Sequence, residues 1–423
     1  MRRSTTRILT THTGSLPRPA KVVEYLLAEK SGSGGNSAAL DLAVRDAIAG
    51  VLAKQVAAGI DIVNDGEQGR TDYTVHVIDR LTGFEGTLAP PRGTGEPEFP
   101  ELAALLSQFA SPFQRWPACS GKVAWKDWPA AEADIARSKA AMAIGERPAY
   151  AKASAGLLPV RRSSKSEGGS DAVPESAFTR VFARDGTAMA GVEEYFMTSP
   201  SPGQIARYLK NDYYKTDEEY LYALADVMAR EYRAIVDAGF VLQLDCPDLA
   251  MSRALYPNIG IDEYRKIIAV NVEALNHSVR DLPPDRMRMH VCWGSTLGPH
   301  HGDVPLRDIV DILLKGRPQA VSFPGANPRH GHEWKVWRDV KLPEGKIIIP
   351  GVIDSTSNFV EHPELVADRI VQYARIVGRD NVIAGADCGF GTFAGRVQVD
   401  TKIVWMKLAS LAEGARLASK QLW

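Results

Sequence analysis

Short apolar runs recur along the chain, and most of them are followed by a segment with helical periodicity. In residues 217–239, "DEEYLYALADVMAREYRAIVDAG", the apolar residues recur three and four positions apart, as they do on one face of a helix. Strands and helices that alternate in this way indicate parallel strands joined by crossover helices. The nearly continuous apolar character of the runs is typical of strands that are buried on both faces.

Nine runs are candidate strands of this parallel sheet. They are residues 7–15, 59–67, 117–125, 191–199, 239–247, 286–294, 319–327, 346–355 and 381–390. A closed (β/α)₈ barrel fits this rhythm and the length of 423 residues better than a doubly wound sheet, because no glycine-rich phosphate-binding fingerprint follows the first run. We therefore expect residues 1–423 to form a single (β/α)₈ barrel domain, an α/β fold. Nine candidates for eight positions mean that one run is a hairpin arm or not a strand.

Three segments interrupt this pattern and are rich in glycine, serine, proline or charge. They are residues 31–39, 86–101 and 161–176. Such compositions are typical of loops and flexible insertions, so we expect loop insertions in the barrel here rather than domain boundaries.

Charge and composition indicate a small-molecule partner. The chain has 50 Lys and Arg against 51 Asp and Glu, a balance that favours neither nucleic acid nor an anionic membrane surface. The basic N-terminal stretch lacks a continuous apolar segment, and no other stretch approaches the roughly 18 apolar residues of a membrane span. We expect a cytoplasmic protein, and the oligomeric state, with a homo-oligomer as one possibility, is left open.

The carboxyl ends of the expected strands carry a concentration of polar residues. A barrel brings these ends together on one face, which is therefore the candidate site. The residues are His12, Gly14, Ser15, Asp65, Glu67, Asp245, Cys246, His290, Cys292, Asp354, Asp387 and Cys388.

His290 and Cys292 form the most specific pattern among these residues. Side chains two positions apart on a strand point to the same side, and a histidine with cysteines from two strand ends suits zinc. The chain has only four cysteines, too few and too scattered for a disulfide framework. Cysteines are also often buried simply as small apolar residues, and we assign that role to Cys119 and Cys246.

Other polar residues have equally ordinary explanations. Asp65, Glu67 and Asp245 are placed where helix N-caps occur in strand-to-helix loops. His330 and His332, in "NPRHGHEW", are a candidate second metal motif, although two histidines in a polar loop are more often solvated or hydrogen-bonded.

Six motifs occur in order along the chain: "TTHTGSLPRP", "IVNDGEQGR", "LQLDCPDLA", "MHVCWG", "GVIDSTSNFVEHPE" and "GADCGFGTF". With these motifs the sequence resembles the cobalamin-independent methionine synthase family, in the short form that carries only the catalytic barrel. The resemblance covers nearly the whole chain. It implies a (β/α)₈ barrel with a zinc ion that binds a thiol substrate as thiolate and presents it to an alkyl donor.

The resemblance assigns roles to particular residues. The zinc ligands of the family fall on His290, Cys292 and Cys388. The residues that bind the ammonium and carboxylate groups of the amino-acid thiol fall on Gly14, Ser15, Glu67 and Asp245.

Two positions depart from the family pattern. The glutamate that completes the zinc ligands falls on Pro324, which cannot coordinate, so the resemblance implies three protein ligands and one open position. The histidine that follows the aspartate of the "GVxD" motif, here Asp354, falls at about Thr356. In the synthases this histidine protonates the departing folate nitrogen. We expect Asp354 to act in the site, with His330 or His332 as the replacement acid.

The resulting hypothesis is a zinc-dependent S-methyl or S-alkyl transferase that acts on a small thiol such as homocysteine, in the manner of the methyl-folate–homocysteine methyltransferases of methionine biosynthesis. A second hypothesis is zinc-dependent transfer of a thiol to an epoxide, or the reverse C–S lyase reaction, as in the coenzyme M transferases of this superfamily. The third is a non-catalytic zinc-binding or thiol-binding protein that has lost its chemistry at Pro324 and Thr356.

Overall fold

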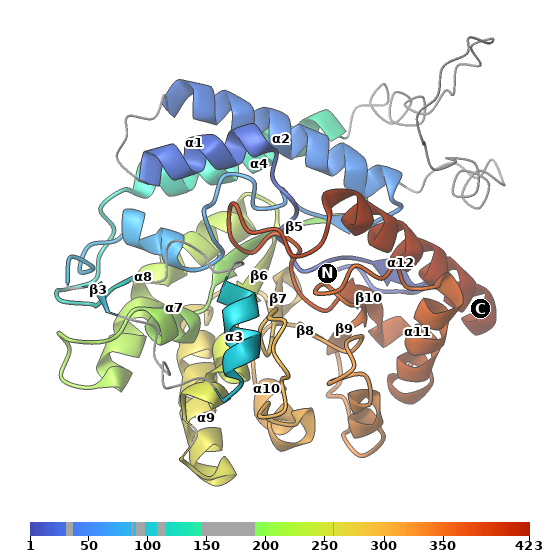
Figure 1. Cartoon of the computed structure of the whole chain (residues 1–423). Coiled ribbons are helices and arrows are strands. Elements are labelled where there is room, and N and C mark those ends of the chain that lie inside the picture. Colours follow the sequence, from blue (N-terminus) through green and yellow to red (C-terminus); the bar gives the residue numbers. More distant parts are fainter. Residues whose placement is uncertain (31–36, 87, 90–97, 108–115, 146–190, 257) are drawn as a thin grey trace.

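A computed structural model of the chain describes residues 1–30, 37–86, 88–89, 98–107, 116–145, 191–256 and 258–423. Eight parallel strands surround a common axis (Figure 1). They are β1 (Leu9–Thr10), β2 (Ile62–Val63), β5 (Glu194–Pro200), β6 (Val241–Asp245), β7 (Met287–His290), β8 (Ala320–Phe323), β9 (Ile347–Ile353) and β10 (Ile383–Ala386). They pair in the order β1-β10-β9-β8-β7-β6-β5-β2, and a parallel bridge between Thr11 and Ile62 joins the two ends of this order. The predicted (β/α)₈ barrel is confirmed.

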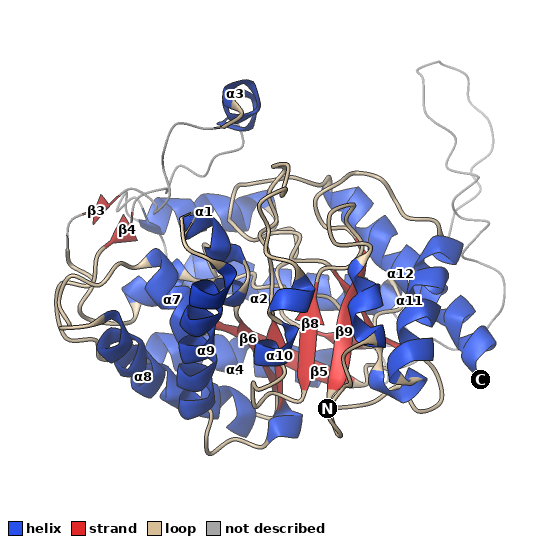
Figure 2. Ribbon diagram, turned by 90° about the horizontal axis from the view of Figure 1, so that it is seen from below, coloured by secondary structure: helices blue, strands red, loops and turns tan. Residues whose placement is uncertain are grey.

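Helices cover the outer surface of the barrel (Figures 1 and 2). They are α1 (Ala20–Lys30), α2 (Ser37–Ala57), α4 (Trp128–Gly145), α7 (Pro202–Tyr208), α8 (Asp217–Asp237), α9 (Ile261–Ser278), α10 (Val310–Leu313), α11 (Pro363–Val377) and α12 (Thr401–Leu422). The helix predicted from residue 217 onward is α8. It begins where the Thr216 side chain accepts a hydrogen bond from the Glu219 amide, and it buries the apolar face that the periodicity indicated.

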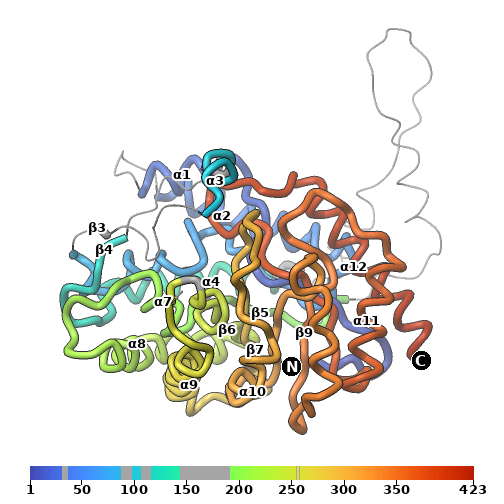
Figure 3. Tube along the Cα trace, turned by 60° about the horizontal axis from the view of Figure 1, so that its bottom comes forward, coloured from blue at the N-terminus to red at the C-terminus, as the bar shows by residue number. Residues whose placement is uncertain are grey.

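The first and last parts of the chain lie side by side (Figure 3). The amide of Ile8 donates to Ser419 Oγ of α12 at 2.9 Å, and the Trp423 indole donates to the Thr5 carbonyl at 3.1 Å. Helix α12 thereby covers the joint between β1 and β10, which the barrel requires to close. None of the helices in the described ranges is long and apolar enough to cross a membrane.

The ninth candidate run, residues 117–125, lies outside the barrel. Strand β4 (Trp116–Pro117) pairs antiparallel with β3 (Leu88–Ala89), which makes it the expected hairpin arm. The rest of the run is held by Cys119, whose amide donates to the Lys210 carbonyl at 2.7 Å.

The structure describes parts of two of the three predicted insertions. Residues 161–176 lie outside the described residues. At the edges of the other two, the loop prediction is wrong: residues 37–39 already belong to α2, residues 88–89 form β3, and residues 100–101 begin α3 (Pro100–Ser107). Helix α3 stands over one end of the barrel, clear of its body in Figure 2, and Phe99 packs edge to face on His301 of the loop after β7.

The barrel interior is apolar at one level and polar directly above it. An apolar layer contains Leu9, Ile62, Phe196, Val241, Ala320, Ile347, Ile349 and Ile383. Over it lies Arg288 of β7, 1% exposed, whose guanidinium is 3.5 Å from the centre of the Phe196 ring. This arginine donates to Gln243 Oε1, Thr11 Oγ1 and the His12 carbonyl at 2.7 to 2.9 Å. It therefore links β6, β7 and the end of β1 immediately beneath the candidate site.

Candidate active site

Three metal-ligating side chains meet at the carboxyl ends of two strands. His290 ends β7, Cys292 follows it by two residues, and Cys388 follows β10 by two residues. Their ligand atoms all lie within 4.8 Å of one another, and the two sulfur atoms are 3.6 Å apart. Both cysteines are free and buried. The residues that sequence reasoning grouped as a metal site are thus brought together by the fold.

The orientation of His290 fits a ligand role. Its Nδ1 lies 3.2 Å from Ser322 Oγ, whereas its Nε2 is buried and has no hydrogen-bond partner within the described part of the chain. A ring nitrogen fixed by a second hydrogen-bonding group while the other is free is the usual arrangement of a metal-ligating histidine. Cys292 Sγ also accepts a hydrogen bond from the Gly294 amide at 3.2 Å, which orients the sulfur. One nitrogen and two sulfur ligands suit zinc.

The two thiols differ in acidity. The hydrogen bond from Cys292, together with His290, lowers the pKa of Cys388 well below its ordinary value. The same hydrogen bond, with burial, raises the pKa of Cys292 well above its own. A metal ion bound here would displace the proton of the hydrogen bond between the two sulfur atoms, because only thiolates coordinate.

A glycine turn brings a buried glutamate close to this group. Glu67 has a left-handed backbone conformation with φ of 55°, which is unusual for a residue with a side chain. Its Oε1 accepts from Thr198 Oγ1 at 3.0 Å, and its Oε2 is buried without a hydrogen-bond partner among the described residues. At Gly14, φ is 145° and a Cβ atom would lie 2.7 Å from Glu67 Oε1, so only glycine permits this approach.

Ser15 continues the turn and packs on the loop that follows Cys388. Its carbonyl accepts from the Phe390 amide at 2.8 Å, and its Oγ accepts from the Gly391 amide at 3.3 Å. His12 supports the turn from below, since its Nδ1 accepts from the Gly14 amide at 3.2 Å. Burial lowers the pKa of His12 to about 3, which makes it neutral and a structural group.

Asp245 completes the acidic part of the site. Its Oδ1 accepts from Gln243 Nε2 at 2.7 Å, and Gln243 is itself oriented by Arg288. Burial, the Glu67 carboxylate and the Cys388 thiolate raise the pKa of Asp245 well above its ordinary value. Burial also raises the pKa of Glu67. Two buried acids next to each other are costly unless a cation lies between them, so this arrangement is suited to an ammonium group.

Other predicted site residues have structural roles. Asp65 accepts from the Glu67 amide at 2.9 Å and from Ser138 Oγ at 2.7 Å, and so shapes the loop that presents Glu67. Cys246 is fully buried in the main apolar core and is not a member of the metal-ligating group, in line with the expected packing role.

Asp387, next to Cys388, holds the loop after β8. Its carboxylate accepts hydrogen bonds from the amides of Gly325, Ala326 and Asn327 and from Asn327 Nδ2, at 2.8 to 2.9 Å. Burial raises the pKa of Asp387 to about 6, although these donors oppose the shift. The loop that carries Pro324 in place of the family's glutamate is thus fixed by a carboxylate with no oxygen left for a metal.

Asp354 organises the loop after β9. Its carboxylate accepts from the Thr356 amide and hydroxyl at 2.9 and 2.8 Å and from the Ser357 amide at 3.1 Å. Its own amide donates to Glu361 Oε1 at 2.7 Å, and Glu361 pairs with the fully buried Lys407 at 2.8 Å. The Asp354 carboxylate is therefore used within the protein, although the residue lines the cavity described next.

A cavity of about 260 Å³ extends from the two cysteines between the loops after β7, β8 and β9. Cys292, Cys388 and the indole of Trp293 form part of its wall. Pro324 and Thr356 also line it, so both departures from the family pattern face the same space. The cavity is the natural place for a second substrate beside the metal-ligating group.

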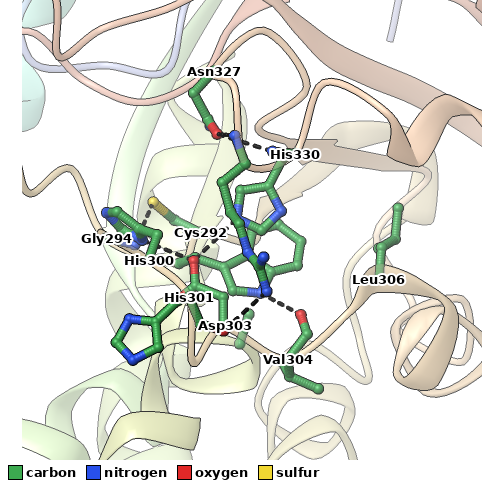
Figure 4. A network of polar contacts seen from close by, with 12 residues as sticks. Cys292, Gly294, His300, His301, Asp303, Val304, Leu306, Asn327 and His330 are labelled. Atoms are coloured by element: carbon green, nitrogen blue, oxygen red, sulfur yellow. Dashed lines mark hydrogen bonds and ion pairs between the residues drawn. The ribbon is translucent and has the colours of Figure 1, made fainter. Parts of the chain in front are cut away.

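His330 belongs to this cavity wall, but both of its ring nitrogens are occupied (Figure 4). Nδ1 lies 2.9 Å from Glu333 Oε2, and Nε2 lies 3.1 Å from Asp303 Oδ2. The ring stacks on Trp293 with centroids 4.2 Å apart. Burial by itself would lower the pKa of His330, but the hydrogen bonds to Asp303 and Glu333 outweigh it and raise the pKa to about 9.

The structure does not bring His332 to the cavity. His332 is exposed and lies at the start of the short 3-10 helix Glu333–Arg338, whereas His330, two residues earlier, is 3% exposed. Sequence reasoning missed Trp293, Asp303 and Glu333, which hold His330 in place. The sequence signal for Asp303 and Glu333 was weak, because acidic residues are common in polar loops and only tertiary contacts distinguish these two.

Comparison with known proteins agrees with this fold. A model of the cobalamin-independent synthase catalytic domain matches residues 8–89, which include Gly14, Ser15 and Glu67. A methionine synthase from Saccharolobus solfataricus is 22% identical over 419 residues, 98% of this chain and 95% of the relative. A methionine synthase from Sulfurisphaera tokodaii is 23% identical over 417 residues, 98% of this chain and 93% of the relative.

A solved structure has the same fold. The B12-independent methionine synthase from Shewanella sp. W3-18-1, in complex with selenomethionine, superposes with a TM-score of 0.63 at 19% identity, covering 98% of this chain and 99% of that chain. The fold and the site define a (β/α)₈ barrel with a histidine and two cysteines at the carboxyl ends of its strands. In sequence, the chain is similar to the cobalamin-independent methionine synthases over nearly its whole length.

The pKa of His330 makes the stability of the loop network depend on pH. A folded-state pKa of about 9 against an ordinary value of 6.5 stabilises the fold fully below pH 6.5, and this contribution is lost as pH rises through 9. We expect His330→Gln to lower the free energy of unfolding by up to roughly 3 kcal/mol at pH 6 and by much less at pH 9.5. Denaturant unfolding at several pH values measures this difference, and exposed His332→Gln is the control. An equal loss at every pH would contradict the assigned protonation of His330.

Proposed function

We propose that the protein is a zinc-dependent transferase that methylates or otherwise alkylates the sulfur of a small amino-acid thiol such as homocysteine. The observation that carries this proposal is the meeting of His290, Cys292 and Cys388 within 4.8 Å, next to two buried acids. Zinc, when bound, supplies the positive charge that lowers the pKa of a substrate thiol, so that the thiolate is present near neutral pH. Three protein ligands leave one position for that thiol.

The protein's own residues bind the rest of the thiol substrate. Glu67 Oε2, which has no partner among the described residues, and Asp245 would receive the ammonium group, with Gly14 and Ser15 beside them. The strained backbone of Glu67 supports this role, because such strain is retained mainly where a side chain must be aimed at a ligand. The Shewanella relative was solved in complex with selenomethionine, an amino acid of the expected product class.

The alkyl donor would occupy the cavity beside Cys292 and Cys388. When a folate-type donor gives up its methyl group, the bond from carbon to a folate nitrogen breaks, and that nitrogen needs a proton. The residue at the family's histidine position is Thr356, and its hydroxyl donates to Asp354. His330 is a poor substitute acid, because both of its nitrogens already donate to carboxylates and its pKa is about 9. This observation favours the second candidate function, thiol alkylation by a donor whose leaving group needs no protonated nitrogen.

The metal content of the purified protein tests the proposed centre. We expect about one zinc ion per chain by elemental analysis. Cys388→Ser should lose zinc, because it removes one of two thiolate ligands. Cys246→Ser changes a fully buried cysteine outside the group and should retain the zinc. A fully active metal-free protein, or a Cys388→Ser variant that keeps its zinc, would show that these residues do not hold the catalytic metal.

Substitution of Glu67 tests recognition of the ammonium group. Glu67→Gln removes one charge of the charge-assisted pair, so homocysteine should bind about 10-fold to 100-fold more weakly, by calorimetric titration, while zinc remains bound. Mercaptoethanol, which lacks an ammonium group, should bind equally well to both proteins. Asp226→Asn is the control, because it removes an equal charge from an exposed side chain of α8. Unchanged affinity for homocysteine would mean that the substrate is a different thiol.

A comparison of donors at fixed homocysteine and zinc tests the role of Thr356. Positioned acid catalysis contributes about 10²-fold to 10⁴-fold, and it is absent here for a nitrogen leaving group. We therefore expect kcat/KM to be higher with a sulfonium donor or a strained electrophile than with methyl-folate, and Thr356→His to leave zinc binding intact. Rapid formation of methionine from methyl-folate by the unaltered protein would refute this and make His330 the next residue to substitute.

A further inference from the structure

Most polar side chains of the donor cavity are already hydrogen-bonded within the protein. Asp387 accepts four hydrogen bonds from the loop after β8, and Asp354 accepts three from its own loop. His330 is held by Asp303 and Glu333. These groups shape the wall and have little capacity left for a substrate.

Ser355 differs from these groups. It lines the cavity and is 2% exposed, and its Oγ is buried without a hydrogen-bond partner in the residues that the structure describes. An unpaired buried hydroxyl costs about 1 to 3 kcal/mol, so a native structure that retains one needs a reason. A ligand in the cavity that accepts this hydrogen bond supplies one.

The backbone on both sides of Ser355 is fixed. The Asp354 amide is bound to Glu361, which Lys407 holds, and the Thr356 and Ser357 amides are bound to the Asp354 carboxylate. The backbone that carries the hydroxyl is therefore fixed before a ligand arrives. Preorganised donors of this kind are effective where negative charge develops during a reaction.

We propose that Ser355 is a catalytic residue that donates a hydrogen bond to the leaving atom of the alkyl donor, and that this atom is an oxygen. The proposal rests on the proposed function, since it assigns the donor class of the same site. The substrate sulfur forms a bond to carbon, the carbon–oxygen bond breaks, and the oxygen takes the electron pair. Solvent returns to that oxygen the proton that the thiol released on ionisation, so the thiol and the donor yield a thioether and a hydroxyl group.

The chemistry of the hydroxyl favours an oxygen leaving atom. A serine hydroxyl is too weak an acid to protonate a departing amine nitrogen, whereas one hydrogen bond stabilises an oxygen that becomes alkoxide-like. A sulfonium leaves as a neutral thioether and needs no such donor.

The test compares three variants of one loop. Ser355→Ala removes the hydroxyl, Ser355→Thr keeps one, and Ser357→Ala removes a hydroxyl two residues away that does not line the cavity. With zinc and homocysteine present, we expect Ser355→Ala to lower kcat/KM for 1,2-epoxypropane about 10-fold to 100-fold and to change turnover of trimethylsulfonium less than about two-fold. Ser355→Thr should retain most of the activity, and Ser357→Ala should match the unaltered protein. An equal loss with both donors, or no loss with the epoxide, would overturn the proposal.

A binding measurement separates this proposal from the proposed function. Tetrahydrofuran, an unreactive cyclic ether, is titrated into the zinc-loaded protein without thiol, and the fluorescence of Trp293 in the cavity wall is followed, with Trp293→Phe identifying the signal. We expect about 3-fold to 10-fold weaker binding to Ser355→Ala. If no donor alkylates homocysteine, the proposed function fails, and this titration still decides the role of Ser355. Equal affinity of the two proteins would overturn that role.

Discussion

The closure of the barrel is the constraint on which the site depends. Parallel pairing from β1 round to β2, joined by the bridge between Thr11 and Ile62, places the carboxyl ends of β7 and β10 on one face. Cys292 and Cys388 are 96 residues apart in the chain, yet their sulfur atoms are 3.6 Å apart. The buried guanidinium of Arg288 lies just below these carboxyl ends. Its hydrogen bonds join β6, β7 and the end of β1 directly beneath the candidate site.

Above the level of Arg288, carboxylates hold the loops together, in addition to apolar packing. Asp387 fixes the loop after β8, Asp354 fixes the loop after β9, and Asp303 joins His300 to His330 between the loops after β7 and β8. Each of these acids satisfies backbone amides or imidazole rings that would otherwise be unpaired on burial. Glu67 stands apart, because its buried Oε2 has no hydrogen-bond partner among the residues that the structure describes, and unused capacity in a buried acid is an indication of a ligand.

The departures from the family pattern form one coherent change. Pro324 and Thr356 line the same cavity, and Asp387, which also lines it, has both carboxylate oxygens engaged. The close approach of Gly14 to Glu67 lies at other strand ends. The two groups of residues can therefore diverge separately.

The sequence by itself determined the rhythm of the barrel and the grouping of three side chains that could hold a metal ion. Eight of the nine runs are barrel strands, because each is short, apolar and followed by a polar turn, and His290 and Cys292 share a side because a strand repeats every two residues. Only the tertiary structure showed that residues 117–125 lie outside the barrel, with Pro117 paired to β3, since that run is as short and apolar as a barrel strand. It also buried His330 but not His332, and it left the Ser355 hydroxyl without a hydrogen-bond partner within the described ranges. Those properties depend on contacts between residues far apart in the chain, such as that of Asp303 with His330, and no local pattern records them.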